Sequence, residues 1–100
     1  LVAGDFNCDA SSTAIGVIKA GGWIDTYTAV HGPKDPGFTY HAFIGPKFAD
    51  KRPPENTIGK IDFIFSRGPI QIHSSEIICD NRNGKYPSDH YFLSAEVALQ

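Results

Sequence analysis

The stretch from Lys60 to Ser66, KIDFIFS, decides the fold that the sequence predicts. Its Ile and Phe residues occupy neighbouring positions, so a strand built from them would be apolar on both faces. Such a strand is normally covered on both sides, by a helix on one side and a second sheet on the other. One hundred residues with four or five strands and one helix are not expected to supply both covers, so the sequence predicts part of a layered sandwich. Asp62 interrupts the apolar run, and a carboxylate there is costly unless a cation or a hydrogen-bond donor meets it.

Working outward from this strand, the sequence predicts a strand-rich chain with one main helix. The helix is expected over 14–20, because Ser11, Ser12 and Thr13 offer N-cap hydroxyls and Gly21 and Gly22 would end it. The segment 23–27 is ambiguous between a short turn and a helix. The other predicted strands are 1–7, 38–43, 70–79 and 91–99, and the predicted polar loops are 45–59 and 80–87.

The bulk properties suit one small domain. One hundred residues are too few for two domains, and no apolar stretch is long enough to span a bilayer. The net charge of −2 gives no overall attraction to nucleic acid or anionic lipid. Any recognition of an anionic substrate would therefore depend on a local site.

Two groups of residues remain open to two interpretations. Five of the nine basic residues fall in one segment, which predicts either a local positive potential or a solvated loop. Cys8 and Cys79 fit no metal-binding spacing and could be paired or free. Both cysteines flank apolar runs, which favours small buried side chains. The basic residues of the segment are Lys47, Lys51, Arg52, Lys60 and Arg67.

Asp5 and Asn7 form the first polar motif. On a strand, residues two apart project from the same face, so these two side chains are expected side by side. A carboxylate beside a carboxamide can take a proton from water and hold a phosphoryl oxygen, which suits general-base hydrolysis. The alternative is an Asx turn that merely ends the strand.

Asp62 and His90 form the second constellation. A carboxylate orients an imidazole and raises its pKa, so His90 is the expected partner of Asp62; the alternative is that backbone amides satisfy Asp62. Asp89 adds one hard oxygen ligand beside one imidazole, which fits a magnesium-type phosphate site better than zinc. A helix N-cap at Ser88 would explain the Asp89-His90 pair nearly as well.

Four motifs in register resemble the C-terminal half of the endonuclease/exonuclease/phosphatase superfamily. They are GDFN at 4–7, GFTY at 37–40, KIDFI at 60–64 and YPSDH at 86–90. The resemblance covers essentially the whole chain and implies an α/β (α+β) fold. Residues 1–100 would form the C-terminal half of one four-layer α-β-β-α sandwich domain, with mostly antiparallel strands and one main helix. The N-terminal half, which in that family carries a metal-binding Glu, would lie outside this chain.

The resemblance also implies a role for each polar residue. Asp5 resembles the base that activates or positions the attacking water and, with Asp89, a ligand of Mg²⁺ or Mn²⁺. Asn7 resembles the residue that positions phosphate and water. Asp62 resembles the carboxylate that orients the histidine, and His90 the histidine that stabilises and contacts the phosphoryl oxygen. Thr39 lies where the family often has a threonine, with no role assigned.

The predicted function is metal-dependent phosphoester hydrolysis by activated water. The substrate would be a phosphodiester or phosphomonoester: a nucleic acid, an inositol phosphate or a lipid head group. Abasic-site cleavage ranks lower, because Gly59 and Lys60 stand where those enzymes carry an aromatic residue. With half of the site outside the chain, the isolated 100 residues are expected to be inactive and prone to associate. The alternative is a non-catalytic fragment or relative that acts as an interaction module.

Overall fold

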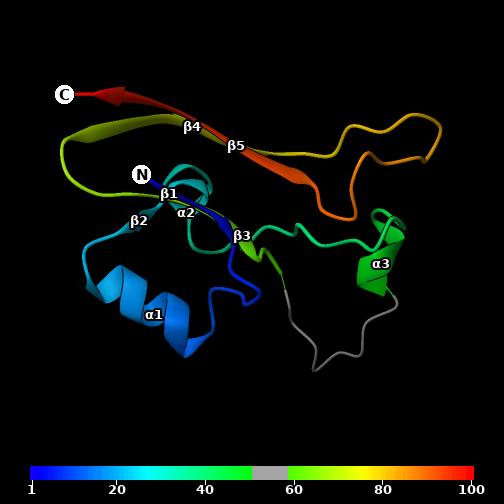
Figure 1. Ribbon diagram of the computed structural model, residues 1–100, viewed down its shortest axis with the longest axis horizontal. Helices are drawn as coiled ribbons and strands as arrows, with labels where there is room; N and C mark the ends of the chain where they lie inside the picture. The colour runs from blue at the N-terminus through cyan, green and yellow to red at the C-terminus, as the bar shows by residue number, and fades with distance from the viewer. Residues whose placement is uncertain (51–58) are drawn as a thin grey trace.

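The protein has a mixed α+β fold with mostly antiparallel strands (Figure 1). The computed structural model describes residues 1–50 and 59–100, apart from the side chains of 49 and 50. The elements, in chain order, are β1 (Val2–Asp5), α1 (Thr13–Ala20), β2 (Ile24–Asp25), α2 (Thr26–His31), α3 (Lys47–Asp50), β3 (Asp62–Ser66), β4 (Ile70–Ile78) and β5 (Phe92–Leu99).

The described strands form two antiparallel sheets. The first has the strand order β1-β3-β2, and the second consists of β4 and β5. Figure 1 shows the long β4–β5 ribbon along one side of the smaller sheet and α1 on the opposite side. In the described part of the chain, β3 therefore lies between a helix and a second sheet, so the expectation that these residues cannot supply both covers is wrong.

Helix α1 forms where its capping residues predict and closes the apolar core. The Ser12 hydroxyl oxygen accepts the backbone N–H of Ile15 (3.2 Å), and Gly21 ends the helix. Ile15 is fully buried against Phe63 and Phe65, whose rings stack 5.0 Å apart on β3. Alternation along β3 sends these two rings toward α1 and leaves the face that carries Asp62 to the β4–β5 side.

The ambiguous segment 23–27 contains all of β2 and the start of α2. Asp25 is the N-cap of α2, and its carboxylate accepts the backbone N–H of Tyr27 (3.0 Å). On the other side of the helix, the Thr26 hydroxyl lies 3.2 Å from the Ser75 hydroxyl, and His31 Nε2 lies 2.6 Å from the Ser75 carbonyl oxygen. Helix α2 thereby joins the first sheet to β4, and it was not resolved from the sequence.

The predicted strand over 38–43 is wrong. Tyr40 makes only an isolated bridge with His90, and the chain then turns because Ala42 and Phe43 adopt positive φ angles of 53° and 63°. Helix α1 is the longest helix that the structure describes, and two shorter helices accompany it. The sequence left α2 ambiguous and did not predict α3, which occupies part of the predicted loop 45–59. Of that loop, residues 51–58 lie outside the described residues.

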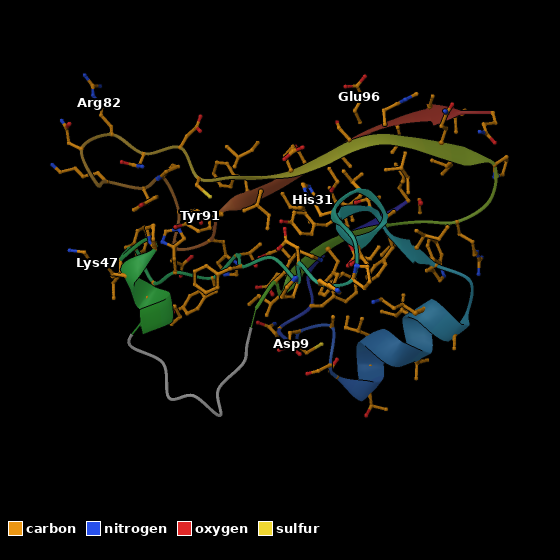
Figure 2. The ribbon with its side chains drawn as sticks, turned by 180° about the vertical axis from the view of Figure 1, so that it is seen from behind. Asp9, His31, Lys47, Arg82, Tyr91 and Glu96 are labelled. Carbon is orange, nitrogen blue, oxygen red and sulfur yellow. The ribbon has the colours of Figure 1, made fainter. Side chains whose placement is uncertain are left out.

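The basic residues of the central segment do not all belong to a loop. Lys60 is buried, which contradicts both interpretations for this residue. The guanidinium of Arg67 lies 4.6 Å from the centre of the Trp23 ring, at the other end of β3. Lys47 begins α3 and, with Arg82, lies at one end of the molecule (Figure 2). The remaining two, Lys51 and Arg52, lie outside the described residues.

Both cysteines are free. Cys8 is half-buried and packs against the core of α1 and β3, in agreement with the expectation of a small buried side chain. Cys79 is exposed, so that expectation is wrong for this residue, which follows the last residue of β4. Among the helices that the structure describes, none has the length and apolar character needed to cross a membrane.

Candidate active site

The register between β1 and β3 brings two carboxylates together. Asp5, the last residue of β1, is paired directly opposite Asp62, the first residue of β3. Like charges opposite each other across an antiparallel pair destabilise the sheet. A cation or a hydrogen-bond donor at this edge relieves the repulsion, and the imidazole of His90 supplies a hydrogen-bond donor.

The imidazole of His90 lies between the two carboxylates. Its Nδ1 is 2.7 Å from Asp62 Oδ2, so the predicted Asp62–His90 pair is present and the backbone-amide alternative for this carboxylate is not needed. Its Nε2 lies 3.8 Å from Asp5 Oδ2 and 3.9 Å from Asp89 Oδ1. One nitrogen is therefore held by Asp62, while the other faces two further carboxylates.

This environment changes the protonation of His90. Burial lowers the pKa of the imidazole, but the hydrogen bond to Asp62 opposes it, and so do the charges of Asp62, Asp5 and Asp89. The net result is a pKa above the usual value for histidine. His90 consequently carries its proton, and a positive charge, over a wider pH range than an isolated imidazole.

A compact loop holds Asp89 and His90. The Ser88 hydroxyl accepts the backbone N–H of His90 (3.1 Å), and the Asp89 carbonyl oxygen accepts the N–H of His41 (2.8 Å). From Ser88 the chain continues into β5, so the N-cap alternative for Ser88 is wrong. The carboxylate of Asp89 is partly exposed and remains open to a ligand.

Asn7 does not occupy the position that strand geometry predicts. Strand β1 ends at Asp5, and Asn7 is exposed with a left-handed φ of 54°. Its backbone N–H donates to Asp5 Oδ1 (2.8 Å), which is the Asx turn of the alternative interpretation. The derivation of a shared strand face is wrong, because the turn begins before Asn7. The turn fixes the Asp5 carboxylate, and a role of the Asn7 carboxamide in holding phosphate stays a prediction.

Sequence reasoning missed a buried ion pair directly behind the site. Lys60 Nζ lies 3.2 Å from Asp25 Oδ2, and both side chains are almost fully buried. The same ammonium donates to the Asp62 carbonyl oxygen (3.2 Å) and lies 3.4 Å from the centre of the Phe63 ring. The position of Lys60 in the KIDFIFS strand offered no signal for its distant partner, which is 35 residues away.

The donor set fits a hard divalent cation. Asp5, Asp62 and His90 each offer one atom, and these atoms lie within 4.8 Å of one another. Asp62 Oδ2 contacts His90 Nδ1 and Asp5 Oδ1 accepts the Asn7 N–H, but each carboxylate has further lone pairs that it can offer to a cation. The carboxylate of Asp89 lies next to this group, with Oδ1 3.9 Å from His90 Nε2. Carboxylate oxygens are the protein ligands that Mg²⁺ prefers.

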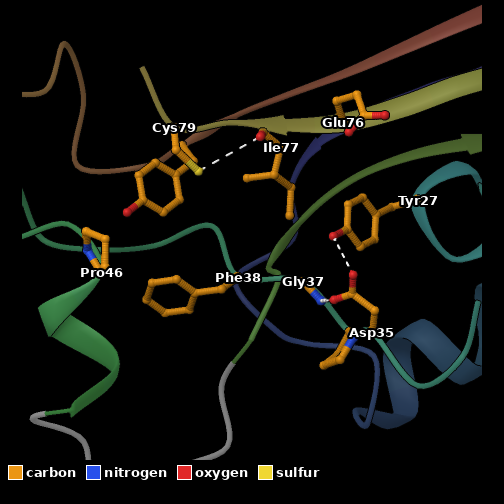
Figure 3. A pocket seen from close by; sticks show the side chains of 10 residues that line it. Tyr27, Asp35, Gly37, Phe38, Pro46, Glu76, Ile77 and Cys79 are labelled. Carbon is orange, nitrogen blue, oxygen red and sulfur yellow. Dashed lines mark hydrogen bonds between the residues drawn. The ribbon is translucent and has the colours of Figure 1, made fainter. Parts of the chain in front are cut away.

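The donor residues line one cavity, and a larger cavity is lined by other residues. One of about 280 Å³ is lined by Asp5, Asp62 and His90, and by Phe92 and Leu93 of β5, so the candidate site opens into the space between the sheets. A larger one of about 570 Å³ is bordered by Tyr27, Asp35, Phe38, Ile77, Cys79 and others (Figure 3). None of the three residues of the candidate metal group lines this larger cavity.

Comparison with known proteins gives a fold likeness. No family model and no curated protein matches the chain. The chain is similar to a crystal structure of a functionally unknown conserved protein from Enterococcus faecalis V583, with a TM-score of 0.72 and 24% sequence identity. The match covers 98% of this chain and 35% of that protein, so this chain spans about a third of the length of the protein that it resembles. At this identity the likeness is one of fold alone.

Proposed function

We propose that this chain belongs to a metal-dependent phosphoesterase of the endonuclease/exonuclease/phosphatase superfamily and carries the C-terminal half of its domain. The observation that supports the proposal most strongly is the His90 imidazole, bonded to Asp62 through Nδ1 and turned toward Asp5 and Asp89 through Nε2. A carboxylate-oriented imidazole facing further carboxylates suits the activation of water beside an anionic centre.

Each residue has a defined task in this proposal. Asp5, fixed by the Asx turn, takes a proton from the attacking water or orients it. His90, kept protonated by its neighbours, donates from Nε2 to a phosphoryl oxygen, and Asp62 holds the ring in the orientation that this requires. Asp5 and Asp89 would hold Mg²⁺ or Mn²⁺, which neutralises charge on the phosphate and leaving oxygens when bound.

The finer fold assignment is part of the same proposal. The helix α1, the β1-β3-β2 sheet and the β4–β5 sheet would be parts of three layers of a four-layer sandwich. The match to only 35% of a larger protein supports the view that further layers complete it. The missing layers would also provide the upstream metal-binding Glu.

The substrate class is tested with the full-length protein. A panel of DNA, RNA, an inositol phosphate and sphingomyelin is incubated with and without Mg²⁺, and release of product is measured. We expect metal-dependent hydrolysis of at least one phosphate ester, and chelation with EDTA should abolish it. Failure to hydrolyse any of these substrates, or the same rate with EDTA, would contradict the proposal.

Paired variants connect the activity to this site. We expect His90→Ala and Asp5→Asn to lower kcat by about 100-fold or more, the range for a lost acid–base group. The matched controls are His73→Ala, on an exposed position of β4, and Asp9→Asn, which lies outside the site. Near-parental rates in either site variant would show that the roles are assigned wrongly.

A further inference from the structure

Thr39 lies at the centre of a set of hydrogen bonds beside the candidate site. Its side chain is fully buried. Its backbone carbonyl accepts the N–H of Tyr91 (2.7 Å), and its hydroxyl oxygen accepts the N–H of Ile61 (3.0 Å). Tyr91 follows His90 and Ile61 precedes Asp62, so one residue contacts both segments that carry the imidazole–carboxylate pair.

The same set of bonds reaches the segment of Asp5. The Ile61 carbonyl accepts the backbone N–H of Phe6 (2.9 Å), and Phe6 follows Asp5. Each of these three bonds is therefore made by the chain neighbour of a site residue. Next to these hydrogen bonds, Tyr40 and His90 form an isolated antiparallel bridge. This bridge aligns the segment of Thr39 with the segment of His90.

We propose that Thr39 is a positioning residue whose hydroxyl sets the spacing between the segment of Asp62 and the segment of His90. The inference rests on the proposed function for its catalytic consequence, and on the hydrogen bonds alone for its structural part. The Asp62–His90 contact of 2.7 Å joins β3 of the first sheet to the loop that leads into β5 of the second sheet. A hydrogen bond of that length weakens steeply when its partners move apart.

Position 39 requires a hydroxyl and not only a side chain of the shape of threonine. Valine would fill the same space, but it has no acceptor for the Ile61 N–H, and buried backbone N–H groups almost always have a partner. Loss of that acceptor is expected to move the start of β3, and with it Asp62. Small displacements of catalytic groups lower rates by about 100-fold per ångström.

The kinetic test compares three variants of the full-length protein with the parent, using the phosphate ester that the parent hydrolyses. Thr39→Val removes the hydroxyl, and Thr39→Ser keeps it. Thr26→Val removes an equally buried hydroxyl, which contacts Ser75 instead of the site segments. We expect Thr39→Val to lower kcat at least tenfold with KM changed less than twofold, while Thr39→Ser and Thr26→Val stay within about threefold.

A second readout needs no substrate. In protein freed of metal with EDTA and labelled with ¹⁵N-histidine, the Nδ1 proton of His90 reports the hydrogen bond to Asp62. We expect its resonance to move upfield and to exchange with water at least tenfold faster in Thr39→Val, and to be unchanged in Thr39→Ser and Thr26→Val. Should Thr39→Val not fold, Thr39→Cys is measured in its place with the same two readouts.

The two readouts separate this inference from the proposed function. If the parent hydrolyses no phosphate ester, the proposed function fails, and the imidazole proton alone decides the role of Thr39. The positioning role is overturned if Thr39→Val has the same imidazole signal and the same kcat as the control Thr26→Val. This holds for any substrate. A loss of kcat in Thr39→Val with full rescue by Thr39→Ser supports it.

Discussion

At the scale of single residues, the site depends on which nitrogen of His90 is held. Asp62 fixes Nδ1, so Nε2 is the atom presented to a ligand. In the proposed mechanism, the carboxylate would act through the imidazole and not on the substrate itself. Its removal should therefore be less damaging than the removal of His90, but still measurable.

We predict that Asp62→Asn lowers kcat by about 10- to 100-fold, the usual cost of losing a group that orients a functional histidine. Steady-state kinetics on the full-length protein measure it. The matched control is Asp35→Asn, because Asp35 also binds an aromatic partner, the Tyr27 hydroxyl (3.1 Å), outside the candidate site. Equal losses in the two variants would indicate general destabilisation instead of a lost orientation.

The buried Lys60 predicts an unusual dependence of stability on pH. Burial lowers the pKa of its ammonium from 10.5 to about 8, although Asp25 opposes this, and Lys19 adds a small lowering effect. The unfolded chain binds more protons than the folded chain between these values. The free energy of unfolding should therefore rise between pH 8 and 10.5, by about 3 kcal/mol at about 1.4 kcal/mol per pH unit.

Urea unfolding at pH 7.5, 8.5 and 9.5 checks this prediction, because these values lie below pH 10, where Tyr27 of the unfolded chain begins to ionise and opposes the rise. The pH-dependent rise should disappear in Lys60→Met and persist in Lys34→Met, whose side chain is exposed. A parent protein whose stability is flat or falls over this range would show that the ammonium is not desolvated as its burial suggests.

The Asp62–His90 pair was predictable from the sequence, whereas the Asp25–Lys60 pair was not. A single carboxylate in an apolar strand demands a partner, and His90 stood in a motif that offered one. Lys60 looked like one member of a basic segment, and Asp25 like part of a turn. Their pairing follows from the entry of α2 beside β3, which local patterns do not encode.

At the scale of elements, α1 contributes stability through one residue above all. Ile15 is fully buried against Phe63 and Phe65, while Val17 on the same helix is exposed. We predict that Ile15→Ala lowers the free energy of unfolding by about 2–5 kcal/mol, because it leaves a cavity over β3. Val17→Ala should change it by less than about 0.5 kcal/mol. Chemical denaturation of both variants measures the difference, and similar values for the two would contradict this account of the core.

The prediction of a strand at 38–43 is wrong for a reason that the local sequence pattern does not show. Its alternation is real, since Thr39 and His41 are fully buried and Tyr40 is only partly so. Extended backbone nevertheless stops at Ala42, where the chain takes a positive φ that alanine rarely adopts. Propensity favours a strand, but the contacts of this segment with the Asp89 loop favour a turn.

At the scale of the whole molecule, apolar surface remains uncovered. All four residues of β1 are exposed, and among the strands that the structure describes β1 is an edge strand that pairs only with β3. Leu1, Val2, Phe92 and Leu99 are large apolar side chains exposed by 42–86%. Unpaired edges and apolar patches of this kind promote association.

We predict that the 100-residue chain, prepared alone, has no appreciable phosphodiesterase activity with Mg²⁺ and self-associates at micromolar concentration. Light scattering after size-exclusion chromatography measures the mass, and the substrate panel measures turnover. Turnover by the isolated chain at the rate of the full-length protein would mean that these residues carry a complete site. A monodisperse monomer would show that the exposed β1 edge is harmless.

The pairing of Asp5 with Asp62 has a consequence for assembly of the fold. Deleting one residue from β1 would swing the carboxylate of Asp5 to the far side of the sheet. Only a chain in which β1 and β3 pair in the correct register brings both carboxylates to the imidazole of His90. If the proposed activity is present, it would therefore require correct strand alignment, and a misaligned chain would be inactive.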